Sequence, residues 1–500
     1  MRRFFKTVAI VTVFSICEKF LGFLYRIFLS RTIGAEGVGL YQVALSVFAF
    51  LLTLTCSGTP ITVSRLMTKY NAENKNDKVN KVITSALAFT LLLSVSICVF
   101  FLTFRNFTKL FFADDRCISI FYVVLIGLIF TSLYAIFRGV FWGSKDFLPY
   151  SIIELLEEVC MIVVGIILIS TTTSAYLGAY YAGVAVLVSY LFSFTLATIV
   201  FFMRGNRLRN PKTEFKPLLS SAMPVTAMRT VNSLAISIVS IVLPLRLVSA
   251  GYSNSQAMSL FGSAVGQAIP ILFIPTTLIG SFTLVLVPEI AENFYNKKHK
   301  RLKNEIEKAV KFTATLTALF IPVFFVCGEE IGVLIFNSTE CGKYLTASAF
   351  LMLFMSLSSL TTSILNSIGQ EKRALAYCIV SGMFMLLSIY FLPKYVGIYS
   401  LLIGFSFVYG LTTILNVILL RKKCTEKPKF IKFILSICAL TAPSILLGCM
   451  LEKLLLPVLG TVFTFLVCSA ITVAFTILLF VGFNLLDISV VVKRLKRKTA

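Results

Sequence analysis

The sequence has little of what most enzymes use for catalysis or metal binding. It holds one histidine, His299, which lies in a basic segment without a partner for a catalytic triad or a metal site. Its 12 cysteines are scattered singly with no C-x-x-C pair, which argues against a zinc site or a disulfide framework. We therefore expect no catalytic residue, no metal and no cofactor, and we expect the cysteines to serve as small packing residues.

Acidic residues and long polar segments are also scarce. The chain has 22 acidic against 46 basic residues and a formal net charge of +24. The basic residues are spread over many short segments between apolar runs, which favours membrane topology signals over nucleic-acid binding. The longest of these segments has about 20 residues, too few for a soluble catalytic domain.

Long apolar runs dominate what the sequence does contain. Hydrophobic residues make up 58% of the chain, and the mean hydropathy is +0.92, far above the value of a soluble domain. Runs of about 20 apolar residues predict an all-α polytopic membrane protein with about 14 spans. The predicted spans are roughly 8–30, 38–62, 82–104, 118–139, 150–170, 176–203, 218–245, 257–287, 309–336, 344–368, 374–392, 396–420, 431–451 and 457–484.

The distribution of lysine and arginine supports this count and gives an orientation. With the amino terminus inside, 35 of the 46 basic residues fall in inside segments, eight fall in outside loops, and three remain within spans. One span too many or too few would exchange the sides of all later loops and remove this asymmetry. We therefore predict a multi-pass protein of the cell membrane with both termini in the cytoplasm.

The first span carries charges that have to face something other than lipid. Glu18, Lys19 and Arg26 lie in the apolar run from Val8 to Leu29. Each ionised side chain at the centre of a bilayer costs about 2.5–3.5 kcal/mol on insertion scales. At about 100° per residue, these three residues and Gly22 fall on one face of the helix, so they predict a polar stripe that faces the protein interior.

The seventh span predicts a second polar face. Arg229, Ser233 and Ser237 project to one side of a helix, as expected for the wall of a wet cavity. We expect Gln42 in the second span and Gln267 in the eighth span to line the same kind of cavity. Helix packing through hydrogen bonds is the alternative for the uncharged members of this set.

Together these charges favour an anionic ligand. Lys19, Arg26 and Arg229 outnumber Glu18, and the planar fork of an arginine suits phosphate oxygens. Glu18 could balance the cations or exchange a coupling proton, and Glu154 at the start of the fifth span is a weaker candidate for the same role. An internal salt bridge is the alternative for the three cations.

Weak internal similarities predict the arrangement of the spans. The ends of the fourth and tenth spans, IFRGVFWG (136–143) and ILNSIG (364–369), match loosely. Transporters are commonly built from such repeats. We therefore expect an amino-terminal lobe of six spans at 1–217 and a carboxyl-terminal lobe of six spans at 218–420. Two additional spans and a basic cytoplasmic tail would follow at 421–500.

Four segments carry a resemblance to a known family. The segments are LGFLYRIFLSRTIGAEGVGLYQ (21–42), FRGVFWGSKDFLPYSIIELLE (137–157), LRLVSAGYSNSQAMSLFG (245–262) and IPILFIPTTLIGSFTLVLVPEIAE (269–292). The L-G-F-x-Y-R, A-G-Y-S and V-P-x-I-A-E stretches within them are the most specific parts. These segments resemble the stage V sporulation protein B family, part of the wider superfamily of multidrug, oligosaccharidyl-lipid and polysaccharide exporters.

This resemblance implies a flippase. Such a protein moves an undecaprenyl-pyrophosphate-linked saccharide to the outer leaflet by alternating access between two lobes. From the charges within the spans we add the hypothesis that Lys19, Arg26 and Arg229 bind the pyrophosphate. Tyr25 and Arg26 stand where the dedicated lipid II flippases carry an Arg-Asp pair. The cargo therefore stays open between a peptidoglycan precursor and a polysaccharide repeat unit.

Two other functions remain as alternatives. A drug or cation antiporter of the same superfamily should present acidic groups to its cargo. A non-transporting scaffold for cell-wall synthesis would tolerate neutral residues in place of the charges within the spans. The expected partners are a lipid-linked anionic saccharide, membrane lipids and, for a scaffold, cell-wall synthesis proteins, whereas nucleic acid is not expected.

Overall fold

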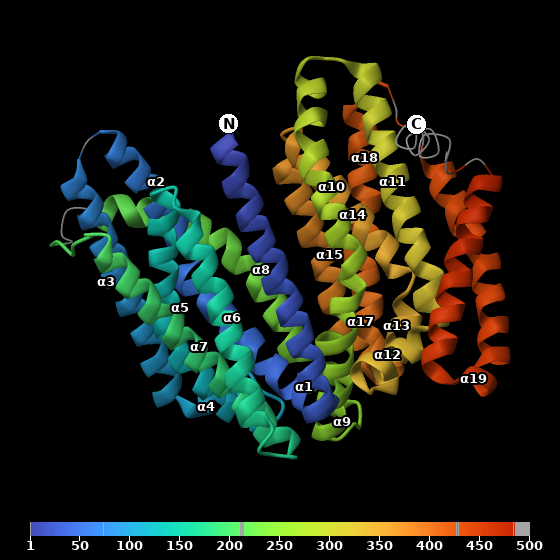
Figure 1. The fold of residues 1–500 in the computed structure, drawn as a ribbon, viewed down its shortest axis with the longest axis horizontal. Helices are drawn as coiled ribbons and strands as arrows, with labels where there is room; N and C mark the ends of the chain where they lie inside the picture. Colours follow the sequence, from blue (N-terminus) through green and yellow to red (C-terminus); the bar gives the residue numbers. More distant parts are fainter. Residues whose placement is uncertain are drawn as a thin grey trace. The chain divides into compact units, whose positions relative to one another are not determined.

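A computed structural model describes residues 2–73, 75–210, 215–426, 428, 430–483 and 485. The described residues form helices and contain no strand, as the apolar runs predict (Figure 1). The chain divides into two compact units, Met1–Gly262 and Ser263–Ala500. The predicted lobe boundaries at 217 and 420 stay a prediction.

The first unit contains the charged first span. Its elements are α1 (Arg2–Cys56), α2 (Thr59–Ala72), α3 (Asn76–Thr103), α4 (Arg105–Lys109), α5 (Arg116–Gly143), α6 (Phe147–Ile169), α7 (Ala175–Met203), α8 (Phe215–Ser249) and α9 (Asn254–Phe261). Helix α1 packs against α5, α6, α7, α8 and α9. A core of apolar side chains from α2, α3, α5 and α7, among them Val63, Ile83, Phe137 and Phe201, fixes one end of this unit.

The second unit begins in a π-helical segment, η1 (Gly262–Ala268), that leads into α10 (Ile269–Tyr295). Helix α11 packs against α19, and α14 packs against α10, α11 and α18. The elements after α10 are α11 (His299–Val326), α12 (Gly328–Phe336), α13 (Thr339–Ser348), α14 (Leu351–Ser367), α15 (Glu371–Phe391), α16 (Pro393–Val396), α17 (Tyr399–Phe405), η2 (Ser406–Leu411), α18 (Thr412–Lys423) and α19 (Ile431–Gly482).

Two of the longest helices are interrupted by glycine. Gly34 in α1 has φ 68° and ψ 178°, and Gly460 in α19 has φ 68° and ψ 173°. A positive φ is readily adopted only by a residue without a Cβ atom. Gly34 lies where the sequence predicts a loop, between 30 and 38, whereas Gly460 lies three residues inside the predicted span 457–484, so the break in α19 comes later than the predicted loop at 452–456.

The count of 14 spans is not confirmed. Helical segments lie over all 14 predicted ranges, but five of the ranges are divided between two or more elements. Among the described residues, ten helices are long and apolar enough to cross a membrane, or 11 if the bent pair Thr339–Ser348 and Leu351–Ser367 forms one span. Helix α6 is not among them. It is apolar apart from Glu154, Glu157 and Glu158, and these three charged residues set it apart from the ten.

Helix α5 packs closely on α2 around Gly139, the residue that follows Arg138. A Cβ atom on Gly139 would lie 2.5 Å from the carbonyl oxygen of Pro60, and one on Gly143 would lie 3.1 Å from that of Ser64. The glycines of the FRGVFWG segment thus let α5 approach the backbone of α2. Arg138, which directly precedes Gly139 in α5, lies at this contact between the two helices.

We expect Gly139→Ala to destabilise the first unit. The added methyl group would clash with backbone atoms of Pro60, which cannot move aside as a flexible side chain can. Such overpacking lowers the free energy of unfolding by about 1–3 kcal/mol. A lower midpoint of thermal unfolding in detergent would show this. Gly382→Ala in α15 is the matched control because nothing lies within 4 Å of its Cβ position. Equal midpoints for the two variants would contradict the packing argument.

Candidate functional site

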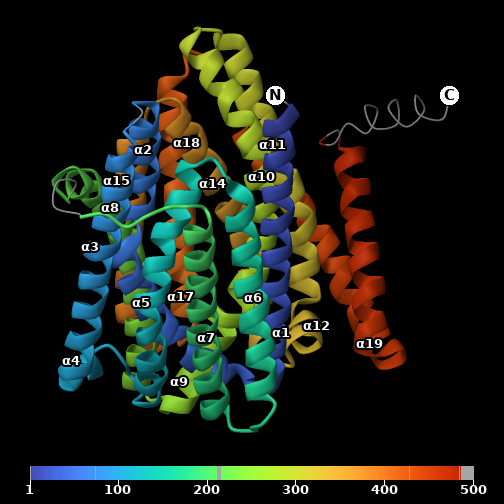
Figure 2. The ribbon, with the colours of Figure 1, turned by 60° about the vertical axis from the view of Figure 1, so that its left-hand side comes forward.

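The polar stripe of the first span faces α6. A Cβ atom on Gly22 would lie 2.9 Å from Oε1 of Glu158, so this carboxylate rests against the stripe. Figure 2 shows α1 and α6 next to each other, and the two helices are in contact. Lys19 is exposed, whereas Glu18 and Arg26 are half-buried. The stripe therefore meets glutamates of a neighbouring helix, which satisfies the requirement that it avoid lipid.

An ion pair that the sequence does not reveal lies beside this stripe. Nη1 of Arg138 is 3.3 Å from Oε1 of Glu154, and the side chains are 32% and 19% exposed. The guanidinium carbon of Arg138 also lies 5.3 Å from the centre of the Trp142 ring. This arrangement places Glu154 between two helices and holds it by a charge-assisted hydrogen bond.

Sequence reasoning misses Arg138 for an identifiable reason. The predicted fourth span ends near 139, so its arginine is counted with the following inside segment. In the structure α5 continues to Gly143, and Arg138 lies within the helix. Arg138 thus joins Lys19, Arg26 and Arg229 as a basic residue well inside a long helix. The sequence does contain a signal for this ion pair. An arginine stands directly before G-V-F-W-G, and three glutamates follow in the next helix.

Glu18 belongs to the same electrostatic cluster. It interacts with Glu154 of α6, with Arg138 of α5 and with its neighbour Lys19. Glu158 interacts with Glu18 in turn. The carboxylates of this neighbourhood are at least as numerous as its cations, so the positive surplus expected from Lys19, Arg26 and Glu18 alone does not describe it. Binding of an anion here requires that a carboxylate be displaced or neutralised.

Arg26 lies close to a buried tyrosine. Tyr41 is 8% exposed and interacts electrostatically with both Arg26 and Glu158. Tyr41 follows the break at Gly34, so it comes from the second half of α1 while Arg26 comes from the first half. A phenol between a cation and a carboxylate can donate a hydrogen bond to either a carboxylate or a phosphate oxygen.

Arg229 lies near the middle of α8, where it contacts the junction of α1 and α2. Its Nη1 donates a hydrogen bond to the carbonyl of Ser57, with a distance of 3.3 Å. Its side chain is exposed, and within the described ranges no carboxylate forms an ion pair with it. Arg138 interacts electrostatically with Cys56, the residue before Ser57. The junction therefore has an arginine from α8 and an arginine from α5 nearby.

The serines of the seventh span hold α8 against α1. Oγ of Ser237 donates a hydrogen bond to the carbonyl of Ser46 at 2.7 Å. Thr53 Oγ1 donates one to Oγ of Ser233 at 3.2 Å. These contacts are those of helix packing, the alternative that the sequence leaves open, and a cavity-lining role for the two serines stays a prediction.

The two glutamines lie in different units. Gln42 is half-buried in α1, and Gln267 is buried in η1 of the second unit. Their roles as cavity-lining residues stay predictions. Among the described residues, no cluster of three or more histidine, cysteine, aspartate or glutamate side chains has the arrangement of a metal site.

The fold is that of membrane transporters. The solved structure of the lipid II flippase MurJ in an inward closed conformation is 16% identical, and the similarity covers 95% of this chain and 98% of that chain with a TM-score of 0.70. An inward-facing multidrug resistance MATE family transporter of the MOP superfamily is 16% identical, with 82% of this chain and 94% of that chain covered and a TM-score of 0.67. The protein is therefore a multi-pass membrane protein.

Residues 4–294 match the family described as polysaccharide biosynthesis protein, and the chain belongs to this family. Stage V sporulation protein B of Bacillus subtilis (strain 168) is 25% identical over 368 residues, which are 70% of this chain and 70% of that protein. The resemblance predicted from the four sequence segments is confirmed.

Proposed function

We propose that the protein is a flippase that translocates an undecaprenyl-pyrophosphate-linked saccharide across the cytoplasmic membrane by alternating access. The observation that carries this proposal is Arg229, an exposed guanidinium near the middle of α8 and within the predicted seventh span, with which no described carboxylate forms an ion pair. A charge kept at this cost within a span marks a substrate or ion pathway. The likeness to a lipid II flippase supports the lipid-linked cargo.

In the proposed site, Arg229, Lys19 and Arg26 are always available to the substrate, whereas Arg138 becomes available only when Glu154 releases it. Arg229 presents further N–H donors to the pyrophosphate, together with Lys19 and Arg26 of the first span. Arg138 would join them when Glu154 releases it. Glu18 and Glu154 thus act as charge-balancing groups that substitute for the substrate in the empty site, and this keeps the cations paired between transport cycles.

The proposed setting follows from the topology of the sequence. Both termini lie in the cytoplasm, and the saccharide moves from the inner to the outer leaflet of the cell membrane. The saccharide is a peptidoglycan precursor or a polysaccharide repeat unit. The protein has a transport role and not an enzymatic one, and its partners are the lipid-linked saccharide and membrane lipids.

Transport by the purified full chain in proteoliposomes tests the proposal. We expect undecaprenyl-pyrophosphate-linked saccharide that carries a fluorescent sugar to reach the opposite leaflet, where a membrane-impermeant quencher detects it. Liposomes without protein provide the background rate. A rate equal to that background would contradict the flippase.

A drug or cation antiporter is the second candidate because the site contains four glutamates, Glu18, Glu154, Glu157 and Glu158, on two facing helices. Carboxylates attract a cationic cargo, and a multidrug transporter shares this fold. Uptake of a cationic dye without flipping of the lipid-linked saccharide would favour this candidate. A scaffold for cell-wall synthesis would give neither activity.

A further inference from the structure

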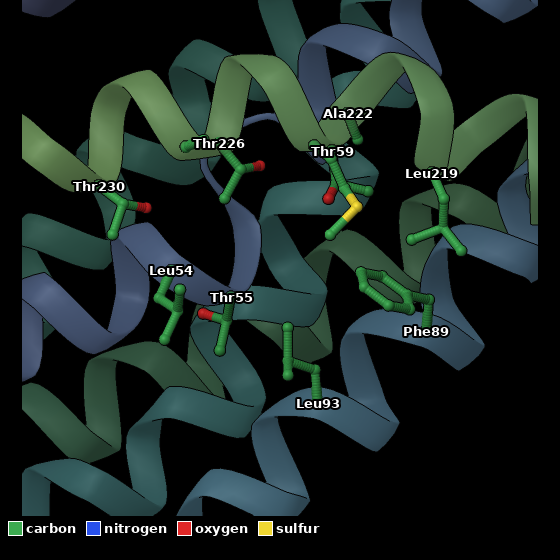
Figure 3. A pocket seen from close by; sticks show the side chains of 11 residues that line it. Leu54, Thr55, Thr59, Phe89, Leu93, Leu219, Ala222, Thr226 and Thr230 are labelled. Atoms are coloured by element: carbon green, nitrogen blue, oxygen red, sulfur yellow. The ribbon is translucent and has the colours of Figure 1, made fainter.

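A cavity of about 530 Å³ lies in the first unit, apart from the glutamate cluster (Figure 3). Its wall comes from the end of α1, the start of α2, the middle of α3 and the first half of α8, and it contains no charged residue. Figure 3 shows Leu54, Phe89, Leu93 and Leu219 around one space. Sites for small molecules commonly have about 300–1,000 Å³, so the cavity can hold part of a ligand that is mainly apolar.

The residues around the cavity indicate whether it opens to water or to the hydrocarbon chains of the membrane. Phe89 and Leu93 are near the middle of α3, a helix long and apolar enough to cross the membrane. Met223 and Ala227 line the cavity and are exposed, and Met223 is 65% exposed. An apolar hollow that opens at this depth meets hydrocarbon chains rather than water. An apolar hollow of this kind suits the chain of a lipid.

One edge of the cavity carries a hydroxyl group, and an arginine that does not itself line the cavity is the neighbouring residue in the helix. Thr230 lines the cavity, and the adjacent Arg229 donates its hydrogen bond to the carbonyl of Ser57. Oγ1 of Thr230 and Oγ of Ser57 are buried and have no hydrogen-bond partner in the described part of the chain. Two unpaired hydroxyl groups beside an arginine offer donors for phosphate oxygens.

We infer that this cavity holds the first isoprenoid units of a polyprenyl chain, with the attached phosphate bound by Arg229, Thr230 and Ser57. The inference rests on the proposed function and adds to it a binding site for the lipid chain within the first unit. It follows from the continuity between an uncharged hydrocarbon site and a group of phosphate donors at its edge. A single molecule that joins a prenyl chain to pyrophosphate satisfies both parts.

Photocrosslinking tests where the chain binds. We would place a benzophenone amino acid at Met223, on the rim of the cavity, in the full chain in lipid nanodiscs. Ile236 is the matched control position, because it is 66% exposed on the same helix and does not line the cavity. We expect undecaprenyl pyrophosphate with an alkyne tag to label position 223 at least about fivefold more than position 236.

Competition identifies the kind of lipid. An excess of untagged undecaprenyl pyrophosphate should remove the labelling at position 223, whereas the same amount of phosphatidylglycerol should leave it. Equal labelling at the two positions would show that the probe only dissolves in the surrounding lipid. Equal competition by phosphatidylglycerol would assign the cavity to ordinary acyl chains. Either result overturns the inference.

Filling the cavity provides an independent test. Ala227→Phe adds a ring at an exposed rim position, so the fold does not have to accommodate it in a packed core. We expect at least about 10-fold weaker binding of undecaprenyl pyrophosphate, with unchanged binding of inorganic pyrophosphate. Leu234→Phe, at a 41% exposed position outside the cavity, should bind both ligands as the wild type does.

The two proposals fail in different ways. Wild-type affinity of Ala227→Phe for undecaprenyl pyrophosphate would overturn the chain site and leave the flippase proposal intact. Absence of undecaprenyl pyrophosphate binding by the wild-type protein would overturn both. A loss of inorganic pyrophosphate binding in Ala227→Phe would overturn the assignment of Ala227 to a chain site separate from the phosphate site.

Discussion

Arg229→Ala is expected to abolish transport of the lipid-linked saccharide while the protein still inserts in the membrane. Loss of one partner of a charged, desolvated contact costs about 2–5 kcal/mol, which corresponds to at least about a 30-fold loss of affinity for the pyrophosphate. The protein should stay folded because Arg229 makes only one hydrogen bond at 3.3 Å to the described backbone and no ion pair there. Proteoliposome flipping and membrane protein level are the measurements.

Arg26→Ala should also abolish transport. Arg229→Lys should retain part of the transport activity. Lysine keeps the charge but lacks the planar fork that binds two phosphate oxygens. Lys216→Ala is the matched control, since Lys216 is an exposed cation at the start of the same helix. Full activity of both alanine variants would remove Arg26 and Arg229 from the substrate site.

The positions of the spans could be predicted because they depend on local composition. Apolar runs and basic loops place helices over all the predicted ranges, and the turn between the first two spans falls at Gly34, inside a glycine-containing segment. The number of qualifying spans could not be fixed in this way. Helix α6 is apolar overall, but its three glutamates are more charges than a span is expected to carry, although α5, α7 and α1 pack against it.

The candidate site was only half predictable for a physical reason. Helical periodicity places Glu18, Lys19 and Arg26 on one face, but it carries no information on which helix covers that face. The facing glutamates follow from the contact of α1 with α6, more than 100 residues later in the sequence. The charge of a site depends on such contacts, so a surplus counted along one helix is not the charge of the folded site.

The ion pair of Arg138 and Glu154 is expected to give the largest effect on folding. Arg138→Ala would leave the carboxylate of Glu154, only 19% exposed, without its partner. Breaking such a pair by removing one partner costs about 3–5 kcal/mol, because an uncompensated charge stays in a poorly solvated place. We therefore expect a strong decrease of folded protein, measured by size-exclusion chromatography in detergent and by thermal unfolding.

The double variant Arg138→Ala with Glu154→Ala separates a structural role from a role in transport. Replacement of both partners by apolar residues is often neutral for stability, so the double variant should recover folded protein. If Arg138 joins the pyrophosphate site when Glu154 releases it, flipping should stay lost in this recovered protein. Glu154→Gln, which keeps the arginine and removes the competing charge, should bind inorganic pyrophosphate more tightly than the wild type. A merely structural pair has no reason to change anion binding. Recovery of flipping in the double variant, or unchanged pyrophosphate affinity in Glu154→Gln, would therefore show that the pair only holds α5 against α6.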